Sequence, residues 1–173
     1  MQLKHTKTRY SDNFAYHAND SVIGMQLTQY GEYQQREINL LSNLLKQDDN
    51  TDTVVWEVGA NIGTHAMAFS KVAKQVVCWE ANPQHFAVLK LNTKGKLAPN
   101  VHCINKAIGA PDVETITVEQ FDDTVSGNYG AARVGSKTGT VIECRTLDSY
   151  LMELPPPSLV KIDVEGHEVD VLK

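Results

Sequence analysis

The feature that most constrains the fold is an alternation of short apolar runs with amphipathic segments, which starts at Thr53. Apolar runs of this length predict strands, and apolar residues spaced three and four apart predict the helices between them. Strands and helices that alternate in this way form a parallel sheet with helices on its faces. We therefore predict a doubly wound α/β sheet, with a ligand bound beyond the carboxyl ends of the strands. The predicted order is strand 53–57, helix 64–74, strand 75–80, helix 83–93 and strand 101–108.

The segments on either side of this core are less regular. Residues 1–30 are polar and weakly patterned, which fits either a flexible arm or a small cap over a substrate, and residues 31–173 form the predicted main domain. A glycine-rich loop at 126–140 is expected to be exposed and mobile. The further predicted elements are helix 32–45, strands 114–119, 141–145 and 159–164, and a helix that starts near Gly166.

Composition narrows the classes of function. A chain of 173 residues suits one domain, and a formal net charge of −5 argues against nucleic acid as the main partner. No apolar stretch is long enough for a membrane span, and the N-terminus lacks the apolar core of a secretory signal. The three cysteines are far apart and lie in apolar runs. We therefore expect a cytoplasmic protein with reduced thiols and no membrane partner.

The loop after the first strand carries the strongest functional signal. Gly59 and Gly63 allow the backbone to turn tightly beside a ligand, and Glu80 ends the second strand, where a carboxylate can accept both hydroxyls of a ribose. Glu57 would repel the pyrophosphate of a dinucleotide but attract the cationic ammonium and sulfonium groups of S-adenosylmethionine. S-adenosylmethionine is therefore the preferred cofactor, and an NAD-dependent oxidoreductase is the alternative.

Four segments of the chain stand out as motifs: WEVGANIGT at 56–64, WEANP at 79–83, KAIG at 106–109, and TLD at 146–148 followed by VKIDVEGHE at 160–168. These segments resemble motifs of the FkbM family of class I methyltransferases. They agree with that family in order and spacing over roughly residues 29 to 173. The resemblance implies a Rossmann-like, seven-stranded doubly wound sheet and S-adenosylmethionine-dependent methyl transfer, usually to a hydroxyl of a sugar or another small acceptor.

Carried over by position, the resemblance also implies a set of cofactor-binding residues. The glycine loop would line the methionine end, the WEANP segment would hold the ribose and the edge of the adenine, and the KAIG segment would flank the adenine ring. The helix that precedes the first strand would reach the same pocket. The set comprises, in that order, Glu57, Gly59, Ala60, Asn61 and Gly63; Glu80, Ala81 and Asn82; Ala107 and Ile108; and Tyr33 and Glu37.

Methyl transfer to an alcohol needs an acceptor oxygen in line with the methyl group and a group that takes its proton. Asp163, Glu165 and His167 follow the fourth core strand and would share one side of an extended backbone. We expect Asp163 to approach the acceptor and His167 to act as a base, with Glu165 beside them. The alternatives are structural roles at a helix start, or a divalent metal such as Mg²⁺ bound by all three. His65 is expected to be packed or hydrogen-bonded, not catalytic.

The chain ends where members of the family continue with further strands. The sheet is therefore expected to be truncated after the fourth core strand, which would leave the strand at 159–164 with an exposed edge. Two expectations follow: either this edge pairs with a second copy of the chain, or the natural protein is longer. A cofactor-binding fragment without catalytic activity is the remaining alternative.

Overall fold

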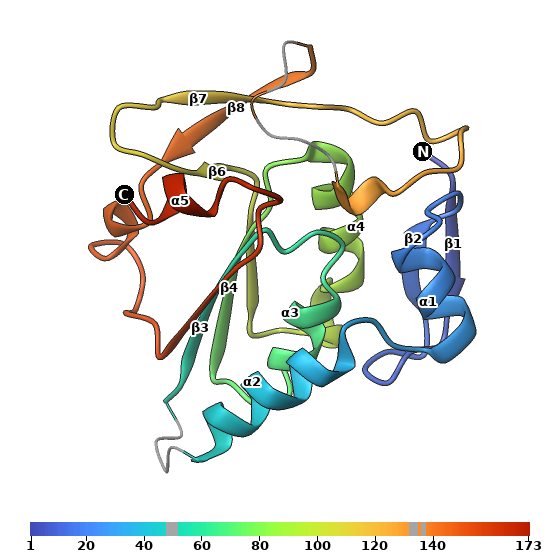
Figure 1. Cartoon of the computed structure of the whole chain (residues 1–173). Coiled ribbons are helices and arrows are strands. Elements are labelled where there is room, and N and C mark those ends of the chain that lie inside the picture. The colour runs from blue at the N-terminus through green and yellow to red at the C-terminus, as the bar shows by residue number, and fades with distance from the viewer. Residues whose placement is uncertain (48–51, 132–134, 136–137) are drawn as a thin grey trace.

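A four-stranded parallel sheet forms the centre of the computed structural model, which describes residues 1–47, 52–131, 135 and 138–173 (Figure 1). The spatial order of its strands is β5-β4-β3-β9, so β3 pairs with β4 on one side and with β9 on the other. The order of the strands therefore reverses at β3, which confirms the predicted doubly wound α/β fold. The strands are β3 (Val54–Val58), β4 (Gln75–Trp79), β5 (Val101–Ile104) and β9 (Leu159–Ile162).

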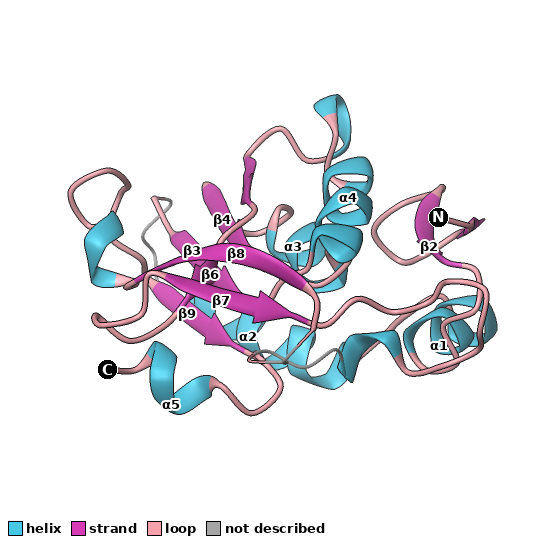
Figure 2. Cartoon of the chain, turned by 90° about the horizontal axis from the view of Figure 1, so that it is seen from above, coloured by secondary structure: helices cyan, strands magenta, loops and turns pink. Residues whose placement is uncertain are grey.

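Both faces of this sheet are covered, which explains why β3 is apolar along almost its whole length. On one face, Val55 and Cys78 pack against α2 (Gln35–Gln47), α3 (Thr64–Phe69) and α4 (Pro83–Asn92) (Figure 2). On the other face, Trp56 and Trp79 meet edge to face with ring centroids 5.3 Å apart. The short helix α5 (Glu168–Val171) and a 3₁₀ turn at Asp148–Tyr150 complete that second face.

The two largest differences between the predicted and the observed elements are a helix and a strand that are shorter than expected. The predicted helix 64–74 ends at Phe69, because the chain tightens into a turn in which Lys71 N–H donates to the Ala68 carbonyl. The predicted strand 101–108 divides after Ile104, since the Asn105 side chain donates to the carbonyls of the β4–α4 turn. Its second part, β6 (Ala107–Ile108), joins a separate three-stranded sheet with β8 (Thr140–Arg145) and β7 (Thr115–Val118).

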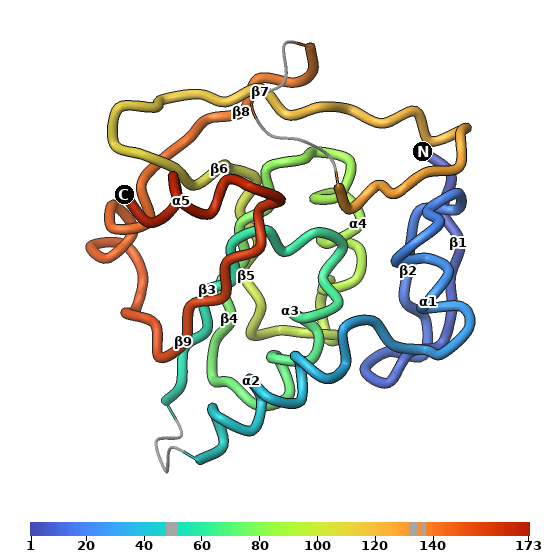
Figure 3. Tube along the Cα trace, viewed as in Figure 1, coloured from blue at the N-terminus to red at the C-terminus, as the bar shows by residue number. Residues whose placement is uncertain are grey.

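Residues 1–30 form an antiparallel hairpin, β1 (Leu3–Thr6) and β2 (Phe14–His17), followed by α1 (Ile23–Tyr30). The side chain of Asn92 in α4 fastens this unit to the core by hydrogen bonds to both the N–H and the carbonyl of Ala15. The unit also meets the loop after β7, where Ser21 N–H donates to the Gly127 carbonyl at 2.9 Å (Figure 3). Segments that are far apart in the sequence therefore lie side by side.

Three further features bear on the expectations from the sequence. Residues 132–134 and 136–137 of the predicted glycine-rich loop lie outside the described residues. Among the described strands β9 pairs only with β3. In the described part of the chain, no helix is both long and apolar enough to cross a membrane.

Candidate active site

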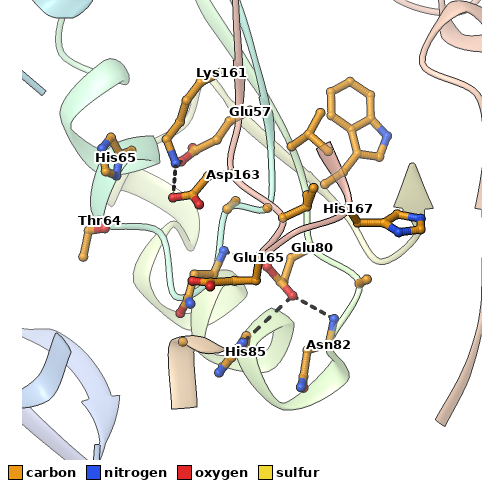
Figure 4. Close-up of a pocket in the computed structure, with 18 of the residues that line it drawn as sticks. Glu57, Thr64, His65, Glu80, Asn82, His85, Lys161, Asp163, Glu165 and His167 are labelled. Carbon is orange, nitrogen blue, oxygen red and sulfur yellow. Dashed lines mark hydrogen bonds and ion pairs between the residues drawn. The ribbon is translucent and has the colours of Figure 1, made fainter. Parts of the chain in front are cut away.

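A cavity that is partly open to solvent lies at the carboxyl ends of β3, β4 and β9 (Figure 4). This is the edge of the sheet at which the sequence predicts a ligand site. Most of the predicted site residues line it: Tyr33, Glu57, Gly59, Ala60, Asn61, Glu80, Ala81, Asn82, Ala107, Ile108, Asp163, Glu165 and His167. Gly63 and Glu37 are not among its lining residues. Gly63 instead makes the turn into α3 with a φ of +92°, and Glu37 lies behind the wall, next to His65.

Gly59 brings the glycine loop into direct contact with the end of β9. Its φ is +82°, and a Cβ atom at this position would lie 1.9 Å from the carbonyl oxygen of Asp163. The N–H groups of Gly59 and Ala60 both donate to the carbonyl of Trp79 at the end of β4. The loop is therefore clamped between its two neighbouring strands, and only glycine fits at this position.

Glu80 lies at the end of β4 and is buried. Its two carboxylate oxygens accept hydrogen bonds of 2.7 Å from the backbone N–H groups of Asn61 and Asn82. The ring of His85 lies 4.0 Å from one of these oxygens. Burial raises the pKa of Glu80 to about 7, although both backbone hydrogen bonds act to lower it.

Glu57 is also fully buried, at the end of β3. Its Oε2 accepts a long contact of 3.6 Å from the Cys78 thiol, whereas Oε1 has no hydrogen-bond partner among the described residues. Burial raises the pKa of Glu57 to about 7, against the positive charge of Lys161, whose Nζ lies 4.0 Å from Oε1. The site therefore holds a carboxylate oxygen that lacks the close partner a buried charge requires.

Lys161 is a functional candidate that the sequence analysis does not assign. Its ammonium group is buried and lies 3.2 Å from Asp163 Oδ2, so it connects Asp163 with Glu57. The available signal is a lysine in the middle of the otherwise apolar strand β9, because a lysine buried on a strand needs a partner. The location of that partner depends on the neighbouring strand and is not visible in the sequence.

The expectation that Asp163, Glu165 and His167 share one side of the chain is wrong. Glu165 has a φ of +51° and Gly166 a φ of +95°, so the backbone turns where the prediction assumes an extended chain. Asp163 turns towards Lys161, whereas the ring of His167 lies at the far end of the cavity, with Nδ1 3.2 Å from Asp170 (Figure 4). Within the described residues no group of three His, Cys, Asp or Glu side chains is arranged to hold a metal ion.

Other cavity-lining residues were not predicted from the sequence because tertiary contacts bring them there. Ile23 comes from the N-terminal unit, and Asn128 and Gly130 come from the loop after β7. A Cβ atom on Gly130 would lie 3.5 Å from Asn61 Nδ2, so this loop closes directly over the glycine loop. In the described ranges the non-glycine residues with positive φ all line this cavity, which is typical of functional sites: Gln34, Asn61 and Glu165.

Comparison with known proteins gives one family and one curated relative. The sequence profile described as "Methyltransferase FkbM domain" matches residues 57–173. The chain is 35% identical over 134 residues to the hexuronic acid methyltransferase AglP of Haloferax volcanii. The aligned region covers 75% of this chain and 53% of AglP, so the chain spans about half the length of that relative.

Two solved structures illustrate the partial similarity of this fold to known structures. One is an S-adenosylmethionine-dependent methyltransferase from Agrobacterium tumefaciens, with 13% identity and a TM-score of 0.44, covering 62% of this chain and 33% of that one. Another is CalS10, an amino pentose methyltransferase from Micromonospora echinaspora, with 18% identity and a TM-score of 0.33, covering 42% of this chain and 29% of that one.

Proposed function

This chain belongs to the FkbM methyltransferase family, and on that premise we propose that it transfers a methyl group from S-adenosylmethionine to a hydroxyl oxygen of a sugar or another small molecule. The observation that carries the proposal is the buried Glu57 carboxylate, whose Oε1 has no hydrogen-bond partner among the described residues. A buried carboxylate oxygen in this state is stabilised by a cation or a hydrogen-bond donor. The ammonium group at the methionine end of the cofactor is a cation and also a hydrogen-bond donor.

The rest of the cavity fits the other parts of the same cofactor. Glu80 is held by two backbone N–H groups, and each of its oxygens keeps a second lone pair that can accept a ribose hydroxyl. Ala107 and Ile108 offer an apolar wall on which an adenine ring can lie. The turn at Gly59 places the backbone of the glycine loop in the wall of the cavity, where a ligand can approach it closely.

The catalytic step divides between the cofactor and the protein. S-adenosylmethionine supplies an activated methyl group when it is bound. The protein positions the acceptor oxygen and provides a group that receives its proton. Asp163 suits this role because Lys161 holds its Oδ2 at 3.2 Å, while Oδ1 has no partner within the described residues. The name of the relative AglP, a hexuronic acid methyltransferase, supports a sugar acid as the acceptor.

A cofactor-binding experiment tests this proposal against the two alternatives. We expect calorimetry to detect binding of S-adenosylmethionine and no binding of NAD. We expect methyl transfer from S-adenosylmethionine to p-nitrophenyl β-D-glucuronide or p-nitrophenyl β-D-glucoside, with an alkali-stable ether as the product. Binding of NAD alone would support an oxidoreductase. Cofactor binding without turnover would indicate a non-catalytic fragment, and an alkali-labile ester would mean that the acceptor is a carboxylate.

The affinity for S-adenosylmethionine is expected to depend on pH. Glu57 has a pKa of about 7 in the free protein and must be ionised to attract the cationic cofactor. Its ionised fraction increases between pH 6 and pH 7.5, so the dissociation constant should fall roughly eightfold over this range. Calorimetry in two buffers with different ionisation enthalpies should also detect proton release on binding. A pH-independent affinity would contradict a role for Glu57 in holding the cofactor.

A further inference from the structure

His65 is the second residue of α3 and lines the cavity, although only 3% of it is exposed. Its Nε2 atom is buried and makes no hydrogen bond among the described residues. The nearest carboxylate oxygen is Glu37 Oε1 of α2, at 3.5 Å from Nε2. A buried and unpartnered imidazole in the wall of a ligand cavity needs an explanation, because such polar atoms are rare in folded proteins.

The position of Glu37 determines which nitrogen of the ring can accept a hydrogen bond. An ionised carboxylate only accepts hydrogen bonds, so it favours the neutral form of His65 in which the proton is on Nε2. Nδ1 is then a bare acceptor. Within the described residues Nδ1 makes no hydrogen bond, and the His65 ring otherwise packs against the ring of Phe69, with centroids 5.9 Å apart. His65 therefore brings to the cavity wall a ring nitrogen that can accept a hydrogen bond from a ligand.

The surroundings of His65 are those expected for the acceptor, not for the adenine. Figure 4 shows His65 at the same end of the cavity as Glu57, Lys161 and Asp163, and His167 at the opposite end. Tyr33 lines the same cavity, and burial together with the nearby charges of Asp163, Glu165 and Glu37 raises its pKa. This end of the cavity therefore contains carboxylates, a phenol and an imidazole, which together suit a ligand rich in hydroxyl groups.

We propose that His65, oriented by Glu37, binds the acceptor hydroxyl by accepting its hydrogen bond at Nδ1. This inference rests on the proposed function, since it assigns a residue to the acceptor of that same reaction. The hydrogen bond fixes the direction of the O–H bond and so turns a lone pair of the oxygen towards the methyl group. His65 thereby replaces His167 as the histidine that contacts the acceptor.

His65 acts as a hydrogen-bond acceptor and does not store the proton. Burial and, to a smaller extent, the positive charge of Lys161 lower the pKa of His65 to about 3, so the ring stays neutral at physiological pH. When the oxygen takes up the methyl group it becomes a protonated ether, which releases its proton along the hydrogen bond to Nδ1. Because the ring cannot keep the proton, it passes on to Asp163 or to solvent, and the ring returns to its neutral form. A neutral and fixed acceptor has the advantage that it works unchanged across the physiological pH range.

The first test measures the state of His65 in the unaltered protein. Nitrogen-15 NMR of histidine-labelled protein should show a neutral His65 ring with its proton on Nε2 between pH 5.5 and pH 8. The His65→Phe variant assigns the signal, because it removes that one resonance. A proton on Nδ1, or a positively charged ring, would overturn the proposal whether or not an acceptor is known.

The second test uses p-nitrophenyl β-D-glucuronide as the acceptor probe. In protein saturated with S-adenosylhomocysteine, the probe should shift the Nδ1 resonance, and His65→Phe should weaken probe binding and raise KM about tenfold. His65→Gln should recover part of this loss, since its amide oxygen can accept the same bond. The affinity for S-adenosylmethionine should stay within about twofold of the unaltered value in both variants.

Control experiments separate failure of this inference from failure of the proposed function. His102→Gln, an exposed substitution on β5, should change neither binding nor KM. Equal affinity of His65→Phe and the unaltered protein for the probe would overturn the role of His65. If the unaltered protein binds neither the probe nor S-adenosylmethionine, the proposed function fails, and the tautomer measured by NMR still decides the assignment of His65.

Discussion

Substitution of Gly59 by alanine is expected to abolish cofactor binding and to lower the free energy of unfolding by about 2–5 kcal/mol. The added Cβ atom would lie 1.9 Å from the carbonyl oxygen of Asp163, and it cannot avoid this atom by a change of rotamer. The left-handed φ of +82° contributes about 1–2 kcal/mol and the forced separation of two backbone segments about 1–3 kcal/mol. Urea unfolding and calorimetry with S-adenosylmethionine measure the two effects.

Gly95→Ala is the matched control for this substitution. Gly95 also has a left-handed φ, of +61°, but no atom lies within 4 Å of its Cβ position. We therefore expect a loss of only about 1–2 kcal/mol and unchanged cofactor binding. If Gly59→Ala and Gly95→Ala were equally stable and bound the cofactor equally well, the contact between the glycine loop and β9 would contribute nothing to stability or to cofactor binding.

The second large effect is a loss of affinity for S-adenosylmethionine, which we expect for Glu57→Gln. The substitution keeps the size and shape of the side chain and removes the negative charge that faces the cationic cofactor. Loss of one partner from a buried charge pair costs about 2–5 kcal/mol, so the affinity for S-adenosylmethionine should fall roughly 30-fold or more. Calorimetry measures this loss. Glu114→Gln, an exposed substitution immediately before β7, is the control and should bind as the unaltered protein does.

The same variant should change how stability depends on pH. Burial raises the pKa of Glu57 from its ordinary 4.5 to about 7, so the folded protein holds a proton that the unfolded chain releases at lower pH. The stabilisation from this proton is complete below pH 4.5 and is lost as the pH rises through 7. Between pH 6 and pH 8, urea unfolding should therefore show a smaller loss of stability for Glu57→Gln than for the unaltered protein. An identical loss in both proteins would mean that Glu57 is ionised throughout this range.

The central sheet was predictable because its signals are local. Each strand is a short apolar run, and Asn82 and Pro83 mark the start of α4 by residue type alone, with the Asn82 side chain accepting a hydrogen bond from Gln84 N–H. The boundaries were harder to predict. The end of the third predicted strand depends on Asn105, whose side chain bonds to carbonyls of another turn. Such a contact leaves no pattern in the neighbouring residues.

The N-terminal unit was the least predictable part of the fold. His17 is almost fully buried, and it packs against His85 and Phe121, which come from α4 and from the loop after β7. Periodicity predicts burial from apolar residues, so a core that includes histidines appears polar and unpatterned. For the same reason, the contribution of Ile23 and Gly130 to the cavity could not be expected from the sequence.

The sequence by itself determined the family, the α/β fold and the edge of the sheet that carries the site. These properties follow from local patterns and from the fact that parallel strands present their carboxyl ends at one edge. Only the tertiary structure decided which side chains meet there. A turn at Glu165 and Gly166 separates His167 from Asp163, and the packing of α2 on α3 puts Glu37 next to His65. The direction of a side chain depends on backbone angles and on neighbours distant in the chain, and neither is encoded in residue spacing.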